Sequence, residues 1–269
     1  MLTRLVLGAA VLLTFIAVRR VRLPPLGIVW AHVTVTAVFG MVAPFFLLAW
    51  GERSTSAALA GVLTAATPLL TLAIATTVLQ TEKASWQRTS LLIAGFVGVI
   101  IVIAPWQSNN GSLIGQLACL GAAGCYAIQT AYVRRFLSRR GIAPLSLAAA
   151  QLIVASALQA VVTPLMPWQT PSLAWSIVFS VVVLGAVNTG VAYVLYFWLI
   201  RDIGATTAAA VNYFVPILAV LIGVVVLADR VTGNMVIGTA LVLLSFALAE
   251  NRLRLTSIAG RKAAVGDQG

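Results

Sequence analysis

The sequence predicts an all-α membrane protein, a bundle of about nine transmembrane helices built from two inverted repeats. Three observations support this fold class: long apolar runs, a one-sided distribution of basic loops, and an internal repeat centred on proline. The chain of 269 residues is 61% hydrophobic and only 9% charged, with a mean hydropathy of +1.04. Soluble domains carry about 25% charged residues. So apolar a chain requires a membrane to cover its surface.

Short connections that contain glycine, proline or charge separate the apolar runs. Runs of about 18 or more apolar residues are typical of membrane-spanning helices, and the first and fourth runs are the shortest here. The predicted spans, in chain order, are Leu2–Val18, Gly27–Ala49, Ser56–Leu79, Ser90–Ala104, Ser112–Val133, Leu145–Met166, Leu173–Ile200, Ala205–Ala228 and Val231–Leu248.

The basic residues set an expected orientation. Alternating the nine spans across the bilayer places fourteen of the 17 Lys and Arg on one side. The other three are Arg4, Arg53 and Arg230. Cytoplasmic loops carry the excess of Lys and Arg. We therefore expect a multi-pass protein of the cell (inner or plasma) membrane with a cytoplasmic C-terminus. The net charge of +11 lies in short loops, which disfavours a nucleic-acid partner because no aromatic-interleaved basic surface forms.

An internal repeat relates the two halves of the chain. "LTAATPLLTLAIATTVLQTEKA" aligns with "VNYFVPILAVLIGVVVLADRV", which pairs Pro68 with Pro216 and Thr64 with Asn212. The two copies lie in the third and eighth spans, five spans apart, and an odd displacement reverses the direction of crossing, so the repeat is inverted. Secondary transporters commonly contain such repeats, with the substrate site near the bilayer midplane.

The repeat predicts an organisation in three parts. A first, four-span copy covers 1–105, a five-span copy covers 111–250, and a cytoplasmic tail covers 251–269. On this count the first copy lacks its opening helix, and an N-terminus outside the cell points to the same missing helix.

These residues resemble the drug/metabolite transporter superfamily, in its EamA-type branch of ten-helix transporters. The resemblance lies in "WGERSTSAALAGVLTAATPLLT" with Glu82, and in "LGAVNTGVAYVLYFWLIRDIGATTAAAVNYFVPILAVLIGVVVLAD". It extends over residues 2–250 and implies export or exchange of small metabolites such as amino acids. The stretch "LTRLVLGAAVLL" resembles the family's second helix, so the chain follows the ten-helix pattern minus helix one.

Polar side chains inside the spans are the candidate substrate-binding residues, because uncompensated polar groups are costly in lipid. They could line a central cavity, or they could join helices by hydrogen bonds without touching a solute. The candidates are Thr64, Thr67, Tyr126, Gln129, Asn188, Thr189, Tyr193, Asn212 and Tyr213. Pro68 and Pro216 are candidate hinges, because proline removes a helix hydrogen bond.

Other chemistry is disfavoured. The six acidic residues lie in loops, span ends or the tail, so no intramembrane carboxylate relay is expected. His32, the single histidine, could titrate near neutral pH or could sit at the interface without a function. Cys119 and Cys125 point to different helix faces and are expected to act as small packing residues. No metal, cofactor or enzyme motif is present.

The leading hypothesis is therefore a secondary transporter that works by alternating access on a small organic solute, with the lipid bilayer as its environment. A homodimer remains open. A second hypothesis is a truncated remnant that inserts without transporting, and a start codon set too far downstream would give the same sequence. A lipid-active membrane enzyme is the third and least favoured hypothesis.

Overall fold

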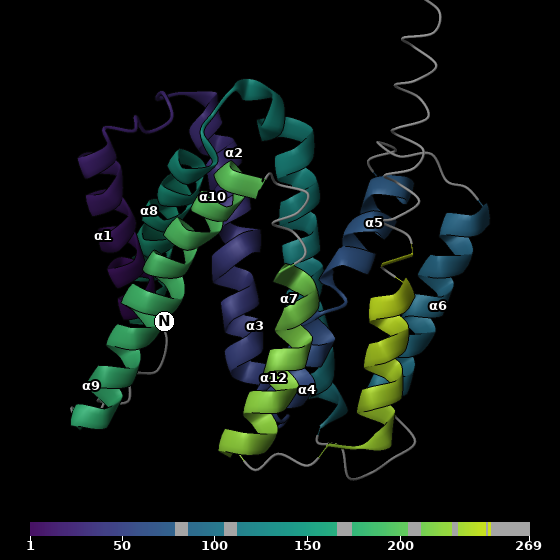
Figure 1. The fold of residues 1–269 in the computed structure, drawn as a ribbon. Helices are drawn as coiled ribbons and strands as arrows, with labels where there is room; N and C mark the ends of the chain where they lie inside the picture. The colour runs from purple at the N-terminus through teal and green to yellow at the C-terminus, as the bar shows by residue number, and fades with distance from the viewer. Residues whose placement is uncertain are drawn as a thin grey trace, which may run out of the picture. The chain divides into compact units, whose positions relative to one another are not determined.

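The computed structural model describes residues 1–78, 86–104, 112–165, 174–203, 211–227, 231–245 and 247–248. Within these ranges every regular element is helical, and each predicted span coincides with a helix or a run of helices (Figure 1). Six helical runs are long and apolar enough to cross a membrane: Leu2–Arg19, Ile28–Gly51, Ala57–Thr77, Leu113–Leu137, Pro144–Val162 and Trp175–Leu195. The all-α membrane fold predicted from the sequence is confirmed.

The first half of the chain contains four helical runs. They are α1 (Leu2–Arg19), then α2 (Ile28–Ala37), η1 (Val38–Val42) and α3 (Ala43–Gly51) in one continuous run, α4 (Ala57–Thr64) with α5 (Thr67–Thr77), and α6 (Trp86–Ile103).

The second half begins with α7 (Leu113–Tyr132), which continues into η2 (Val133–Leu137) and η3 (Ser138–Arg140). It goes on with α8 (Pro144–Val162), η4 (Thr163–Leu165), the run α9 (Trp175–Val182), η5 (Val183–Val191) and α10 (Ala192–Ile203), and then α12 (Val211–Leu227). A short apolar helix, Gly233–Ser245, follows.

Local sequence signals explain several helix ends. The hydroxyl of Ser56 accepts a hydrogen bond of 3.2 Å from the Leu59 amide and caps the start of α4. Pro144 occupies the first turn of α8, where its missing N–H costs nothing. Gly141 takes a left-handed conformation (φ 66°) that ends η3, as glycine does at many helix ends. Arg20 ends α1 in the same region (φ 53°), which is less favourable for a residue with a side chain.

The chain divides into two compact units. Unit one comprises residues 1–46 and 128–211, and unit two comprises residues 47–127 and 212–269. Each unit thus takes helices from both halves of the sequence.

In unit one, α1 packs on α8 and on η5, and α2 also packs on α8 (Figure 1). The core between them contains fully buried Leu5, Leu12 and Leu152 together with small alanines such as Ala149 and Ala155. Small residues allow helix backbones to approach closely, which is the main source of helix association in lipid.

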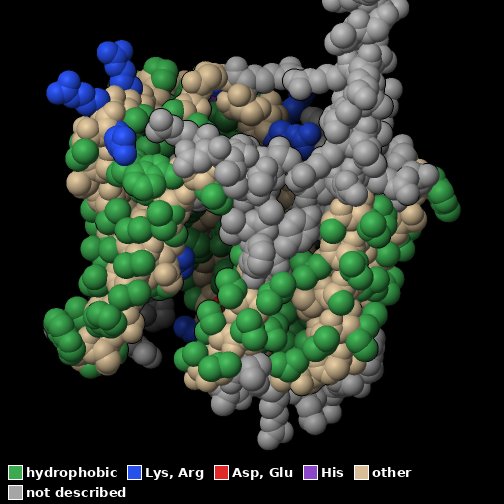
Figure 2. Space-filling model, viewed as in Figure 1, with side chains coloured by type: hydrophobic (Ala, Val, Ile, Leu, Met, Phe, Trp, Pro, Cys, Tyr) green, Lys and Arg blue, Asp and Glu red, His purple; other side chains and the backbone are tan. Residues whose placement is uncertain are grey.

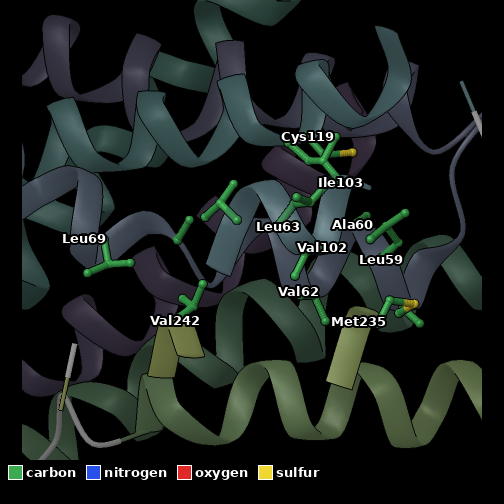
Figure 3. Packing of buried hydrophobic residues seen from close by; sticks show 13 residues of the cluster. Leu59, Ala60, Val62, Leu63, Leu69, Val102, Ile103, Cys119, Met235 and Val242 are labelled. Atoms are coloured by element: carbon green, nitrogen blue, oxygen red, sulfur yellow. The ribbon is translucent and has the colours of Figure 1, made fainter. Parts of the chain in front are cut away.

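In unit two, the core joins α4, α5, α6, α7 and the helix Gly233–Ser245 (Figure 3). Leu63, Leu69, Val102, Cys119 and Val242 are all buried in it. The confinement of Cys119 to this apolar core agrees with its expected role in packing. A glycine pair brings two helices together, because a Cβ on Gly238 would lie 2.6 Å from the carbonyl oxygen of Gly98.

Large hydrophobic side chains cover much of the surface. Val18, Trp175 and Val225 are each more than 70% exposed, and Figure 2 shows hydrophobic side chains over most of the coloured surface in that view. An aqueous protein rarely tolerates so extensive an apolar surface, whereas lipid tails cover it without cost.

Candidate substrate-binding site

Arg4 and Thr189 form a contact between α1 and η5 in unit one. The Nε of Arg4 donates a hydrogen bond of 3.1 Å to the Thr189 hydroxyl, and the guanidinium carbon lies 4.1 Å from the ring centroid of Phe45. Thr189 lies midway between Trp175 and Ile203, the ends of the α9–η5–α10 run. The Arg4 guanidinium therefore lies beside the middle of the α9–η5–α10 run.

The sequence analysis counted Arg4 with the three basic residues on the side opposite the cytoplasm and did not predict its contact with Thr189. Hydropathy locates a residue along its own helix, whereas its level relative to a neighbouring helix is set by how the two helices pack. Arg4 is thus a candidate functional residue that the sequence analysis missed. Its signal was available, because Arg4 is a lone charge in the first turn of an apolar run.

Close packing fixes the α1–η5 contact. A Cβ on Gly8 would lie 2.8 Å from Cγ2 of Thr189, and a Cβ on Gly185 would lie 2.8 Å from Cβ of Leu7 and 3.0 Å from the backbone oxygen of Arg4. The two distances of 2.8 Å are shorter than real Cβ contacts, so a side chain at either glycine would force neighbouring atoms to shift. Glycine at these positions therefore allows the backbones to meet and holds Arg4 against η5.

Thr189 itself is 2% exposed and lies in a π-helical segment. Its hydroxyl donates a hydrogen bond of 3.0 Å to the carbonyl oxygen of Leu184, five residues earlier, and accepts one from Arg4. Both hydrogen-bonding directions of this hydroxyl are thus used within unit one. Thr189 positions Arg4, and π-helical segments of this kind occur frequently at functional sites.

Two further predicted site residues flank Thr189 on the same run. Asn188 is exposed, and Tyr193 is half-buried against the apolar core of unit one. Gln129, on α7, is half-buried, and its side chain lies against the backbone of η1, because a Cβ on Gly40 would lie 2.8 Å from Cγ of Gln129. Asn188, Thr189, Tyr193 and Gln129 therefore all belong to unit one.

In unit two, the predicted third span is interrupted between α4 and α5. Pro68 lies in the first turn of α5, and α4 ends at Thr64, four residues earlier. Proline has no N–H and its ring clashes with the carbonyl four residues before it, which explains the break at this point. The Thr67 hydroxyl donates 2.6 Å to that Thr64 carbonyl, and the Thr64 hydroxyl donates 2.8 Å to Gly61.

The remaining candidates also belong to unit two. Tyr126 is half-buried on α7. Asn212, Tyr213 and Pro216 lie on α12, whose backbone runs as a helix through Pro216, and their side chains lie outside the described residues. A convergence of all nine candidates on one cavity stays a prediction.

A second polar cluster surrounds His32 in unit one. Nδ1 of His32 lies 2.8 Å from the Tyr132 hydroxyl, and Nη2 of Arg140 lies 3.2 Å from Nε2 of His32. A guanidinium can only donate, so Arg140 is the donor in this contact. The Phe136 ring stacks on the imidazole at 5.6 Å. The cluster ties α2 to the end of α7.

Metal-binding groups are limited in the part of the chain that the structure describes. No group of three or more His, Cys, Asp and Glu side chains there is placed to hold a metal ion. The polar groups of the candidate site are instead hydroxyls, amides and one guanidinium, which can bind a solute by hydrogen bonds and charge.

A sequence model of the "EamA-like transporter family" matches residues 1–104 and again residues 113–250. The chain belongs to the EamA-like transporter family. It is therefore a multi-pass membrane protein of a transporter family, as the resemblance in its sequence implied.

Relatives of this EamA-like chain carry transporter names. The "Uncharacterized transporter YoaV" of Bacillus subtilis is 27% identical over 168 residues, which cover 60% of this chain and 56% of YoaV. An "Uncharacterized transporter" of Archaeoglobus fulgidus is 24% identical over 77% of this chain and 72% of its own length. The "Uncharacterized transporter YvbV" of Bacillus subtilis is 24% identical over 65% of this chain and 56% of YvbV. The match thus spans little more than half of YoaV and of YvbV.

A known crystal structure has the same fold as this EamA-like chain. It aligns with a TM-score of 0.62 and 23% identity, over 92% of this chain and 85% of the other. At this level of identity the likeness concerns the fold alone.

Proposed function

We propose that this EamA-like protein is a secondary transporter, an exporter or exchanger of small organic metabolites such as amino acids, rather than an enzyme. The observation that supports this proposal best is the family match in two separate blocks, one in each half of the chain. Two related blocks fit the inverted repeats of secondary transporters. The transporter names of the three relatives support the same class of function.

The proposed mechanism is alternating access. Residues 1–105 and 111–250 act as the two repeats, which lie in the inner or plasma membrane. Residues 251–269 form a cytoplasmic tail. Pro68 and Pro216 act as hinges in this proposal. The break in the helix before Pro68 supports the first hinge, because an interrupted helix bends more easily than a continuous one.

The proposed solute site uses hydroxyl, amide and phenol groups from several spans. Polar groups at mid-membrane depth face a bundle interior or a wet cavity in most membrane proteins. The residues proposed to bind the solute are Thr64, Thr67, Tyr126, Gln129, Asn188, Thr189, Tyr193, Asn212 and Tyr213. The partners are the solute and the surrounding lipid, and the proposal allows a homodimer.

Solute flux in proteoliposomes tests this proposal. The purified chain is reconstituted into liposomes, which are loaded with a panel of amino acids and small metabolites. Efflux and exchange of radiolabelled solute are then measured. We expect saturable flux of at least one solute above the rate in protein-free liposomes, and a lower rate in the Tyr193→Ala variant. The proposal would be contradicted if folded and correctly inserted protein moved every solute of the panel only at the rate measured in protein-free liposomes.

A further inference from the structure

The inference concerns a groove on the surface of unit one. One wall is formed by residues of α1 between Ala10 and Val18, and the other by Val191 and Val194, where η5 joins α10. The groove has a volume of about 440 Å³, which lies in the range of sites that hold a small ligand. Both walls belong to unit one, in which α1 packs against η5 and α10 (Figure 1).

The groove has an apolar lining. Of the residues that line it, only Thr14 carries a polar group, and the Thr14 hydroxyl donates a hydrogen bond of 2.8 Å to the carbonyl oxygen of Ala10. The walls therefore offer no polar group in need of a partner. Such a groove suits a hydrocarbon chain, because a polar ligand would lose its bonds to water there without replacement.

The length and position of the groove match one leaflet of a bilayer. Ala10 and Val18 are eight residues apart, so the α1 wall extends about 12 Å along the helix. Half of the hydrocarbon core of a bilayer measures about 15 Å. The groove ends next to Arg19, the last residue of α1, where a long basic side chain reaches the level of the lipid headgroups.

Arg19 is held at this end of the groove by one aromatic ring from each side. Its guanidinium carbon lies 5.5 Å from the ring centroid of Phe15, on α1, and 5.8 Å from that of Trp198, on α10. The two rings themselves lie 6.0 Å apart. Cation–π contacts position the guanidinium and leave its N–H groups unused. Among the described residues these rings are the partners of Arg19, so its donors are available to a ligand.

A guanidinium with available donors favours an anionic oxygen group. Arginine binds phosphate oxygens through paired N–H groups. Arg20 and Arg22, both exposed, follow Arg19 in the chain and add positive charge at the same end of α1. The lipids of the cytoplasmic leaflet are rich in negative charge and attract such clusters. A phospholipid combines the two groups that the surface calls for, a hydrocarbon chain for the groove and a phosphate for Arg19.

We propose that this groove, together with Arg19, is a binding site for one anionic phospholipid. An acyl chain lies between α1 and the η5–α10 junction, and the phosphate binds the Arg19 guanidinium. Phe15 and Trp198 act as positioning residues. The site is separate from the residues proposed to bind the solute, and the proposal does not depend on transport.

Native mass spectrometry of the purified full chain in detergent tests this inference. The probes are phosphatidylglycerol, phosphatidylcholine with the same acyl chains, and glycerol 3-phosphate, which has the phosphate without the chains. Arg19→Gln and Arg19→Lys alter the headgroup contact. Ala10→Phe and Thr14→Phe narrow the groove from two exposed positions, and thermal unfolding without added lipid shows that each variant is folded.

Two further variants are matched controls. Arg135→Gln removes another exposed arginine whose guanidinium lies over an aromatic ring, 6.0 Å from the centroid of Phe136, at a place with no part in the groove. Val6→Phe adds the same ring as Ala10→Phe at an exposed position of α1 that does not line the groove.

We expect the unmodified chain to retain one phosphatidylglycerol more tightly than phosphatidylcholine, and glycerol 3-phosphate to bind far more weakly than either. In Arg19→Gln the apparent affinity for phosphatidylglycerol should fall about tenfold, as for the loss of a charged hydrogen bond, and Arg19→Lys should recover part of it. Ala10→Phe and Thr14→Phe should lower the retention of both phospholipids. Arg135→Gln and Val6→Phe should bind as the unmodified chain does.

Several results would overturn the inference. Equal retention of the two phospholipids, or an equal loss in Arg19→Gln and Arg135→Gln, would show that Arg19 recognises no headgroup. Full retention in folded Ala10→Phe and Thr14→Phe, or tight binding of glycerol 3-phosphate, would show that the groove holds no acyl chain. A dimer that Ala10→Phe dissociates would assign the groove to a second copy of the chain.

Discussion

The hydroxyl of Thr67 donates a hydrogen bond of 2.6 Å to the carbonyl oxygen of Thr64, the acceptor that Pro68 cannot serve. The side chain thus supplies a donor where the backbone lacks one. This compensation explains how a proline in the middle of an apolar span is accommodated without leaving a buried carbonyl unsatisfied.

We therefore predict that Thr67→Val destabilises the protein by about 1–2 kcal/mol, because the Thr64 carbonyl loses its donor in an apolar environment. Thermal or denaturant unfolding in detergent micelles measures the change. Thr77→Val is the matched control, since its hydroxyl is exposed and bonds to the carbonyl of Ala73 further along the same helix. Equal stability of the two variants would contradict the prediction.

A second prediction concerns the α1–η5 contact. Gly185→Ala places a Cβ 2.8 Å from that of Leu7, and overpacking of this kind costs about 1–3 kcal/mol. Gly124→Ala is the control, because the space around Gly124 is open within 4 Å and alanine is the better helix former. Unfolding measurements on both variants should therefore give opposite signs, and a Gly185→Ala protein as stable as the original would refute the close contact.

The third prediction concerns transport. Replacing Asn212 by Leu or Tyr193 by Ala removes a proposed solute contact, so we expect solute flux in proteoliposomes to fall by about tenfold or more. Membrane insertion and monodispersity in detergent should stay unchanged, since neither change adds charge to a span. If both variants transport at the original rate, these two residues do not belong to the site.

The fourth prediction concerns orientation. The loop after α3 should face the outside and the segment η2–η3 the cytoplasm, because basic residues concentrate on the second side. Arg53→Cys and Ser138→Cys, both at exposed positions, are introduced singly into a chain in which Cys119 and Cys125 are replaced. A membrane-impermeant maleimide should label the first in intact cells and the second only after permeabilisation. Labelling of both cysteines in intact cells would contradict the orientation.

Hydropathy predicted the helical spans well, because each span must satisfy its own backbone in lipid. It predicted less about their interiors. The run Ser56–Leu79 read as one span, whereas the structure separates α4 from α5 at Ala65 and Ala66. The π-helical segments, such as η5, were not foreseen, because apolar composition is the same in an α-helix and a π-helix.

The contact between Arg4 and Thr189 was not predicted from the sequence. Polar residues in apolar runs were recognisable one helix at a time, as with Thr189 and Gln129. The pairing of Thr189 with Arg4 depends on the relative level of two helices that are distant in sequence. Packing at Gly8 and Gly185 sets this level, and a hydropathy window contains no information about it.

The π-helical segment η5 has a consequence for how this region could have changed in evolution. A π-helical turn contains about one residue more than an α-helical turn, so a single-residue deletion within Val183–Val191 would remove one such extra residue. Everything after the deletion would then rotate by about 100° about the helix axis. Tyr193 would leave its present face, while residues before the deletion would keep theirs. Insertions and deletions of one codon in this segment would therefore rotate the part of the helix that follows the change without breaking the helix.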